Sequence, residues 1–218
     1  MNKSQLYDKI EALLLAECGQ YGYTLSGSKD HDIIKSYTNN GTTCNINIGI
    51  SVGAYRDFKC KVSLYAGISY IEICQPVIDH YIYGEKNLFS PQVSIGEWGF
   101  SPEPTREIAT GKDLEAYFEF LRRIIQQNIL PYFDDKTDIK KFAPFFLDYT
   151  LARKLDSAQS SMSLAYALVI CRYAQMPNLD NILNKLYRQS KRTFDHDAFK
   201  KFLVKQGFKM PTGILTWF

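Results

Sequence analysis

Two runs of strictly alternating residues constrain the fold of this chain more than any other feature. Apolar residues occupy every second position from Cys44 to Val52, and the alternation resumes from Phe58 to Leu64 after a short segment that contains Gly53. Because successive side chains of a strand point to opposite faces, this pattern predicts an antiparallel β-hairpin with one buried and one wet face. The residues expected to point inward are Ile46, Ile48, Ile50, Phe58, Val62 and Leu64.

The chain after this hairpin contains further strand-like segments. Residues 65–74 alternate as a strand would, and Pro76 is expected to end that segment; a short helix at 77–83 fits equally well. Residues 92–100 alternate again and predict another strand, followed by a loop rich in proline at 102–104.

Helical spacing dominates the rest of the sequence. A first helix is expected from Ser4, and the strongest helix follows Thr110, which forms a capping-box signature with Asp113. Pro131 is expected to end that helix. Only helices are predicted after it, and the segment 163–174, which is apolar nearly all round, is expected to be the central one.

These elements together predict an α+β fold, in which a small antiparallel β-sheet packed on helices is followed by a C-terminal all-helical part. The apolar stripe of the helix over 112–130 is expected to lie on the buried face of the hairpin. A boundary near 132–136 divides the chain into a sheet domain at 1–133 and a helical domain, or an extension packed on the first, at 134–218.

The cysteines and the hydropathy of the chain indicate the cellular compartment in which the protein is expected. No two of the five cysteines form a CxxC pair, so free thiols are expected. The N-terminus leads into a charged amphipathic helix, and the longest apolar run, 164–171, is far shorter than the roughly 20 residues that span a bilayer. We therefore expect a cytoplasmic protein with no membrane partner. The cysteines are Cys18, Cys44, Cys60, Cys74 and Cys171.

Catalytic signals are weak. Each of the three histidines has an aspartate neighbour, but side chains adjacent in sequence point in different directions. Asp195 and Asp197, which flank His196, are expected to serve a helix N-terminus, where negative charge is favourable. The glycines at 49 and 53 lie within strands rather than before a helix, which disfavours a phosphate loop. We expect no catalytic residues, metal or cofactor; an enzyme site assembled from scattered residues is an alternative.

Large side chains on the predicted sheet are the main candidates for binding a protein partner. Tyr, Trp and Arg are enriched at binding hot spots. The sheet candidates lie at the hairpin turn, on the wet face and in the last strand, although packing under the C-terminal helices is the slightly more favoured role for Trp98 and Phe100. They are Tyr55, Arg56, Lys59, Lys61, Glu97 and Trp98.

Charge is distributed unevenly along the chain. Residues 1–111 carry 9 Lys/Arg and 12 Asp/Glu, whereas residues 112–218 carry 17 and 11. This suggests, as an alternative, a helical module that binds an acidic protein or nucleic acid. Nucleic acid is the less expected partner, because basic residues are dispersed among acidic ones. The densest basic cluster is Lys185, Arg188, Lys191 and Arg192.

The order of elements also resembles a known family. A helix, antiparallel strands joined by a Gly-Ala-Tyr-Arg turn at 53–56, an aromatic strand and a long helix ending in Asn-Ile-Leu-Pro-Tyr-Phe at 128–133 are similar to a bacterial family defined only as a domain of unknown function. The resemblance covers residues 4–133. Some members occur beside toxin genes as candidate immunity proteins, so the resemblance implies a protein partner and no catalytic residues.

Overall fold

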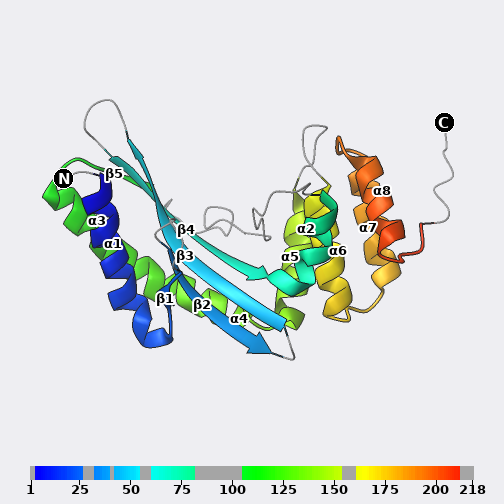
Figure 1. The fold of residues 1–218 in the computed structure, drawn as a ribbon, viewed down its shortest axis with the longest axis horizontal. Helices are drawn as coiled ribbons and strands as arrows, with labels where there is room; N and C mark the ends of the chain where they lie inside the picture. Colours follow the sequence, from blue (N-terminus) through cyan, green and yellow to red (C-terminus); the bar gives the residue numbers. More distant parts are fainter. Residues whose placement is uncertain are drawn as a thin grey trace. The chain divides into compact units, whose positions relative to one another are not determined.

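A computed structural model describes most of the chain, which divides into two compact units. The first unit consists of residues 1–70 and 92–135, and the second of residues 71–91 and 136–218. The predicted α+β class is confirmed, since the sheet is N-terminal and the C-terminal half is helical (Figure 1). The described residues are 3–26, 32–39, 42–54, 60–81, 105–153 and 161–211.

Within these residues, the first unit contains a five-stranded sheet in the order β1-β2-β3-β4-β5. Every pair of neighbouring strands is antiparallel and consecutive in sequence, so the sheet is a meander. The strands are β1 (Thr24–Leu25), β2 (Asp32–Asn39), β3 (Thr42–Ala54), β4 (Cys60–Tyr70) and β5 (Thr105–Ile108).

The long hairpin β3–β4 is the predicted one. Its strands pair from Cys44 opposite Tyr70 to Ala54 opposite Cys60. Five of the six residues expected inside are at most 4% exposed, and Phe58 lies outside the described residues. The five are Ile46, Ile48, Ile50, Val62 and Leu64.

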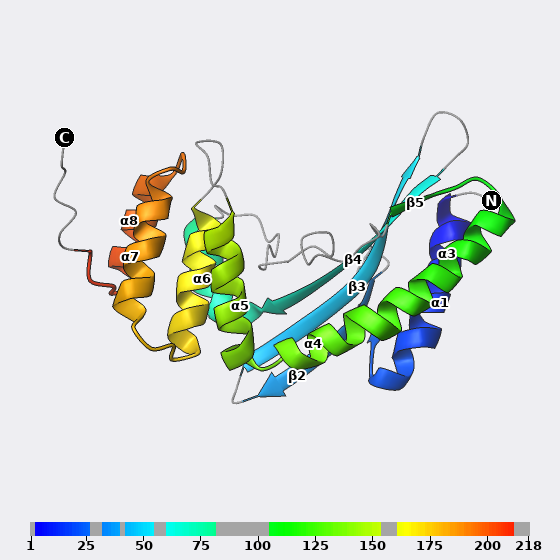
Figure 2. The same ribbon diagram turned by 180° about the vertical axis from the view of Figure 1, so that it is seen from behind.

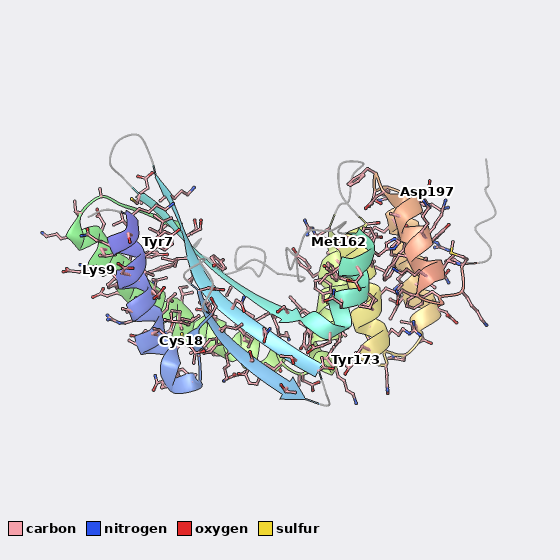
Figure 3. The ribbon with its side chains drawn as sticks, in the orientation of Figure 1. Tyr7, Lys9, Cys18, Met162, Tyr173 and Asp197 are labelled. Atoms are coloured by element: carbon pink, nitrogen blue, oxygen red, sulfur yellow. The ribbon has the colours of Figure 1, made fainter. Side chains whose placement is uncertain are left out.

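Two helices cover the apolar face of this sheet (Figures 1 and 2). Helix α1 (Lys3–Cys18) lies along β2 and β3, and helix α3 (Gly111–Ile124) lies along β5 and α1. A hydrogen bond adds to this packing, because the Val52 amide donates to the Tyr7 hydroxyl at 3.0 Å (Figure 3). The predicted helical partner of the hairpin therefore shares the apolar face with α1.

The start of α3 is the predicted capping box. Thr110 Oγ1 accepts a hydrogen bond from the Asp113 amide at 3.2 Å, and Asp113 Oδ2 accepts one from the Thr110 amide at 2.8 Å. These bonds satisfy two donors at the first turn that have no partner within the helix.

The end of this helix differs from the prediction. Pro131 does not stop it, because α3 continues through a π-helical turn, η3 (Ile125–Ile129), into α4 (Leu130–Lys136). Proline lacks an amide hydrogen, and its ring displaces the carbonyl four residues earlier. The wider π turn directly before Pro131 shifts the hydrogen-bond pattern there, so the helical direction is kept.

In the second unit, one apolar helix lies at the centre, as predicted. Helix α6 (Met162–Tyr173) packs against all four other described helices of this unit, and its residues from Leu164 to Cys171 are buried. The other helices are α2 (Ile71–Tyr81), α5 (Ile139–Ala152), α7 (Leu179–Ser190) and α8 (His196–Lys205).

Helix α2 replaces the strand expected up to Pro76. Strand β4 ends at Tyr70 and α2 begins at the next residue, with Pro76 inside the helix. The buried residues Ile73, Cys74, Val77 and Ile78 form pairs four positions apart, so the sequence also fits a helix that packs on α6. The predicted boundary near residue 133 assigns this segment to the sheet part, whereas the structure groups it with the helical unit.

Other elements differ in detail. Strand β5 follows directly after the predicted loop at 102–104, and α5 is a continuous helix although it contains Pro144. The predicted strand at 92–100 lies outside the described residues. No helix in the described part of the chain is long and apolar enough to cross a bilayer.

Candidate binding surfaces

The face of the sheet opposite α1 carries short polar side chains, and we call it the polar sheet face. The register places Ser36, Asn45 and Ser69 in one row across β2, β3 and β4, and Ser51 opposite Ser63 in another. Ser36 Oγ donates to Asn45 Oδ1 at 2.7 Å, and Ser69 Oγ donates to the Asn45 carbonyl at 3.5 Å. The row is therefore connected by side-chain hydrogen bonds.

A tyrosine lies flat on this face. Asp32, Gly49 and Tyr65 are register partners on β2, β3 and β4, and the Tyr65 ring and hydroxyl occupy the space beside the Gly49 Cα. The carboxylate of Asp32 accepts a hydrogen bond from the Ser26 hydroxyl. Gly49 thus leaves room for an aromatic ring, which accounts for a glycine inside a strand.

Of the six sheet candidates predicted from the sequence, the structure places one. Lys61 is exposed on the polar sheet face, where Gly53 and Glu107 are its register partners. The remaining five lie outside the described residues: Tyr55, Arg56, Lys59, Glu97 and Trp98.

The second surface is formed by the predicted basic cluster, which we call the basic face: Lys185, Arg188, Lys191 and Arg192. Helix α7 buries Ile182, Leu183 and Leu186. At 3.6 residues per turn, this places Lys185 and Arg188 on its opposite, exposed side, and the exposed Lys191 and Arg192 lie in the turn directly after the helix. Within the described chain none of the four basic side chains forms an ion pair.

The turn between α7 and α8 presents an aromatic side chain beside the basic face. Thr193 is buried and its Oγ1 donates to the Ser190 carbonyl at 2.7 Å, whereas Phe194 is 68% exposed. Sequence reasoning did not identify Phe194. The sequence did contain one indication of its exposure. Phe194 lies between two predicted helices and does not continue the apolar periodicity of either one.

The carboxylates near this turn already have partners. Asp195 and Asp197 lie at the start of α8, as N-cap residue and in the first turn, but the Asp195 side chain makes no capping hydrogen bond to this helix (Figure 3). Asp195 Oδ1 accepts from the Ser161 amide at 2.6 Å, and Asp197 Oδ1 accepts from Lys200 Nζ at 2.9 Å. The hydrogen bond from Lys200 lowers the pKa of Asp197, which therefore remains charged.

Two histidines connect helices in this unit. The Ser190 hydroxyl donates to the Tyr187 carbonyl at 2.7 Å, so His196 Nδ1, 2.8 Å from Ser190 Oγ, is the donor of that contact. Burial, followed by the nearby charge of Lys200, lowers the pKa of His196. His80 Nε2 lies 2.8 Å from the Ala198 carbonyl and joins α2 to α8. His31 lies outside the described residues.

Other chemistry in the described part of the chain is limited. No three His, Cys, Asp or Glu side chains in the described ranges group as metal ligands would. A cavity of about 410 Å³ lies between α1, β4 and the start of α3, with Lys9 and Cys60 among its lining residues. Cys60 is half-buried there, whereas the other four cysteines are buried, and all five are free thiols.

Comparison with known proteins gives no relatives: no family model, curated protein or solved structure matches this chain. The resemblance of residues 4–133 to a bacterial family of candidate immunity proteins therefore stays a prediction. Its helical motif at 128–133 spans the end of η3 and the beginning of α4.

Proposed function

We propose that this chain is a non-enzymatic binding protein that holds a protein partner on the polar sheet face. The observation that carries the proposal is the hydrogen-bonded row of Ser36, Asn45 and Ser69 on a sheet whose other face is covered by helices. A surface of short polar side chains offers many hydrogen-bonding groups without long side chains to be ordered on binding.

The position of Tyr65 supports the same proposal. Its ring lies against Gly49 in the centre of the hairpin, so little rotamer freedom is left for a partner to remove. Tyrosine combines a large apolar body with a polar tip, and it is common at binding hot spots for that reason. The expected partner therefore covers β2, β3 and β4 around this ring.

Quantitative affinity capture from the native cells tests this proposal. The double variant Ser36→Arg/Ser69→Arg places two long cations on the polar sheet face, and Ala12→Arg/Ala16→Arg places the same charges on the exposed side of α1. We expect a protein retained by the wild type and the α1 variant and lost with the sheet variant. Equal retention by all three, with unchanged circular dichroism, would show that the partner does not use this face.

A second candidate function is binding of an anionic partner through the basic face. Four exposed cations that form no ion pair with any described residue, followed in sequence by an exposed Phe194, support it. Because exposed charges are screened within about 8 Å at physiological salt, capture by this surface should weaken as salt rises. Charge reversal by Lys185→Glu/Arg188→Glu should abolish it, while capture on the polar sheet face should respond to neither change.

A further inference from the structure

We propose that the basic face and Phe194 together bind single-stranded nucleic acid without regard to sequence, with the cations on phosphates and the Phe194 ring stacked on a base. This inference rests on the second candidate function and names its ligand. Single strands are bound in this way where a basic track lies beside an aromatic platform, because every base offers a π face.

The basic face extends from the last turns of α7 into the turn that follows. Lys185 and Arg188 lie three residues apart on the exposed side of α7, and Lys191 and Arg192 come directly after its last residue, Ser190. At a rise of 1.5 Å per residue, Lys185 and Arg188 are about 4.5 Å apart along the helix axis. A stacked strand advances by about 3.4 Å per nucleotide, so these two cations suit neighbouring phosphates.

Within the described residues the cations of the basic face form no ion pair, and Lys191 Nζ lies 5.8 Å from the centroid of the Tyr187 ring. Asp180 lies at the other end of α7, and the two carboxylates near the turn accept hydrogen bonds from Ser161 and Lys200. The expectation that nucleic acid is an unlikely partner rested on basic residues dispersed among acidic ones. That premise is weaker for the basic face, because the two carboxylates near the turn accept hydrogen bonds from residues outside this face.

Phe194 is held in an outward position at the end of the basic face. The buried Thr193 is bonded to the Ser190 carbonyl, and Ser190 is in turn bonded to His196 at the start of α8. These bonds hold the backbone on both sides of the turn, so the exposed Phe194 follows Lys191 and Arg192 on a segment whose backbone needs little further ordering on binding.

Fluorescence anisotropy with labelled oligothymidylate and oligouridylate tests the inference on the full chain. We expect saturable binding whose log–log salt slope is about −3, since each of four neutralised phosphates contributes about −0.7 for a single strand. Phe194→Ala should weaken binding roughly tenfold with an unchanged slope, Phe194→Tyr should retain it, and Lys185→Glu/Arg188→Glu should weaken it and flatten the slope. The matched control, Lys112→Glu/Arg123→Glu on the exposed side of α3, should change neither quantity.

Several outcomes would overturn the inference. Absence of binding at about 50 mM salt, equal loss in the α3 control, or no effect of Phe194→Ala would each reject it. Tighter binding to a duplex of equal length would reject the preference for single strands. Binding of polyglutamate or of phosphatidylserine vesicles without binding of either oligonucleotide would reject nucleic acid as the ligand and leave an anionic partner of another class as the second candidate function.

Discussion

At the scale of single residues, Tyr65 occupies the space that a side chain at position 49 would need. A Cβ there would lie far inside van der Waals contact with the Tyr65 ring and hydroxyl and close to the Asp32 Cβ. We expect Gly49→Ala to lower the free energy of unfolding by about 1–3 kcal/mol, as overpacking usually does. Urea denaturation followed by circular dichroism measures this loss.

Gly53→Ala is the matched control on the same strand. Among the described residues, a Cβ at position 53 would meet only the Lys61 carbonyl oxygen, at 3.9 Å, so no destabilisation is expected. Adding Tyr65→Ala to Gly49→Ala should remove the overlap, so Gly49→Ala should cost less stability in the Tyr65→Ala background than in the wild type. A loss for Gly49→Ala no larger than that for Gly53→Ala would contradict the assigned packing.

The thiols allow a second test at this scale. We expect Cys60 alone to react rapidly with a disulfide reagent in the folded protein, because the other four cysteines are buried, and all five to react after denaturation. A count below five in the unreduced, denatured protein would contradict the free-thiol assignment.

The same thiols predict a pH dependence of stability. Burial raises the pKa of Cys18, Cys44 and Cys171 to about 12. In the unfolded chain these thiols ionise from about pH 8.5, whereas in the folded protein they stay protonated. Their contribution to stability is therefore complete below about pH 8 and is lost as the pH rises towards 12. Urea unfolding at neutral and alkaline pH measures the loss, which should be smaller in a Cys18→Ala/Cys171→Ala variant.

At the scale of elements, the capping box of α3 gives a direct prediction. Thr110→Ala removes the side-chain acceptor of the Asp113 amide and should cost about 1 kcal/mol of stability. Thr110→Ser keeps the hydroxyl and should cost much less. Equal losses for the two variants in thermal or urea unfolding would mean that the cap does not stabilise the helix.

Some of the helices and strands can be predicted from the sequence, and others cannot. The β3–β4 hairpin follows from alternation because Ile46, Ile48 and Ile50 share one face of a strand, whereas in a helix Ile48 would point away from the other two. The apolar residues between Ile71 and Ile78 fit both periods, and contact with α6, which is distant in sequence, decides for a helix. Pro131 does not end the helix because a π turn precedes it. Such a turn is defined by its backbone hydrogen bonds, and the amino-acid sequence gives no sign of it.

The candidate surfaces were predictable to different degrees. Lys185, Arg188, Lys191 and Arg192 are close in sequence, and helical periodicity alone places the first two on one side. The exposure of Phe194 depends on the buried Thr193 and on where α8 begins, neither of which composition indicates. The hydrogen bonds among Ser36, Asn45 and Ser69 required the strand register.

At the scale of the whole molecule, the helical unit is not one continuous segment. Its central helix α6 packs against α2, which precedes β5 in sequence. We expect a fragment of residues 134–218 to have lower helicity and a lower urea midpoint than the same fragment with residues 71–81 fused to it by a Gly/Ser linker. Equal stability of the two fragments would show that α2 is dispensable for this unit.

The direct passage from Tyr70 in β4 to Ile71 in α2 also has a consequence during synthesis. Helix α2 leaves the ribosome about 80 residues ahead of α6, a delay of roughly 4–16 s at common translation rates. During that interval the apolar side of α2 has no α6 to cover it, although the β3–β4 hairpin that precedes it in sequence has already been synthesised. The nascent chain therefore carries a complete hairpin joined to a helix whose apolar side is exposed. A chaperone that covers apolar surface would be most useful at this stage.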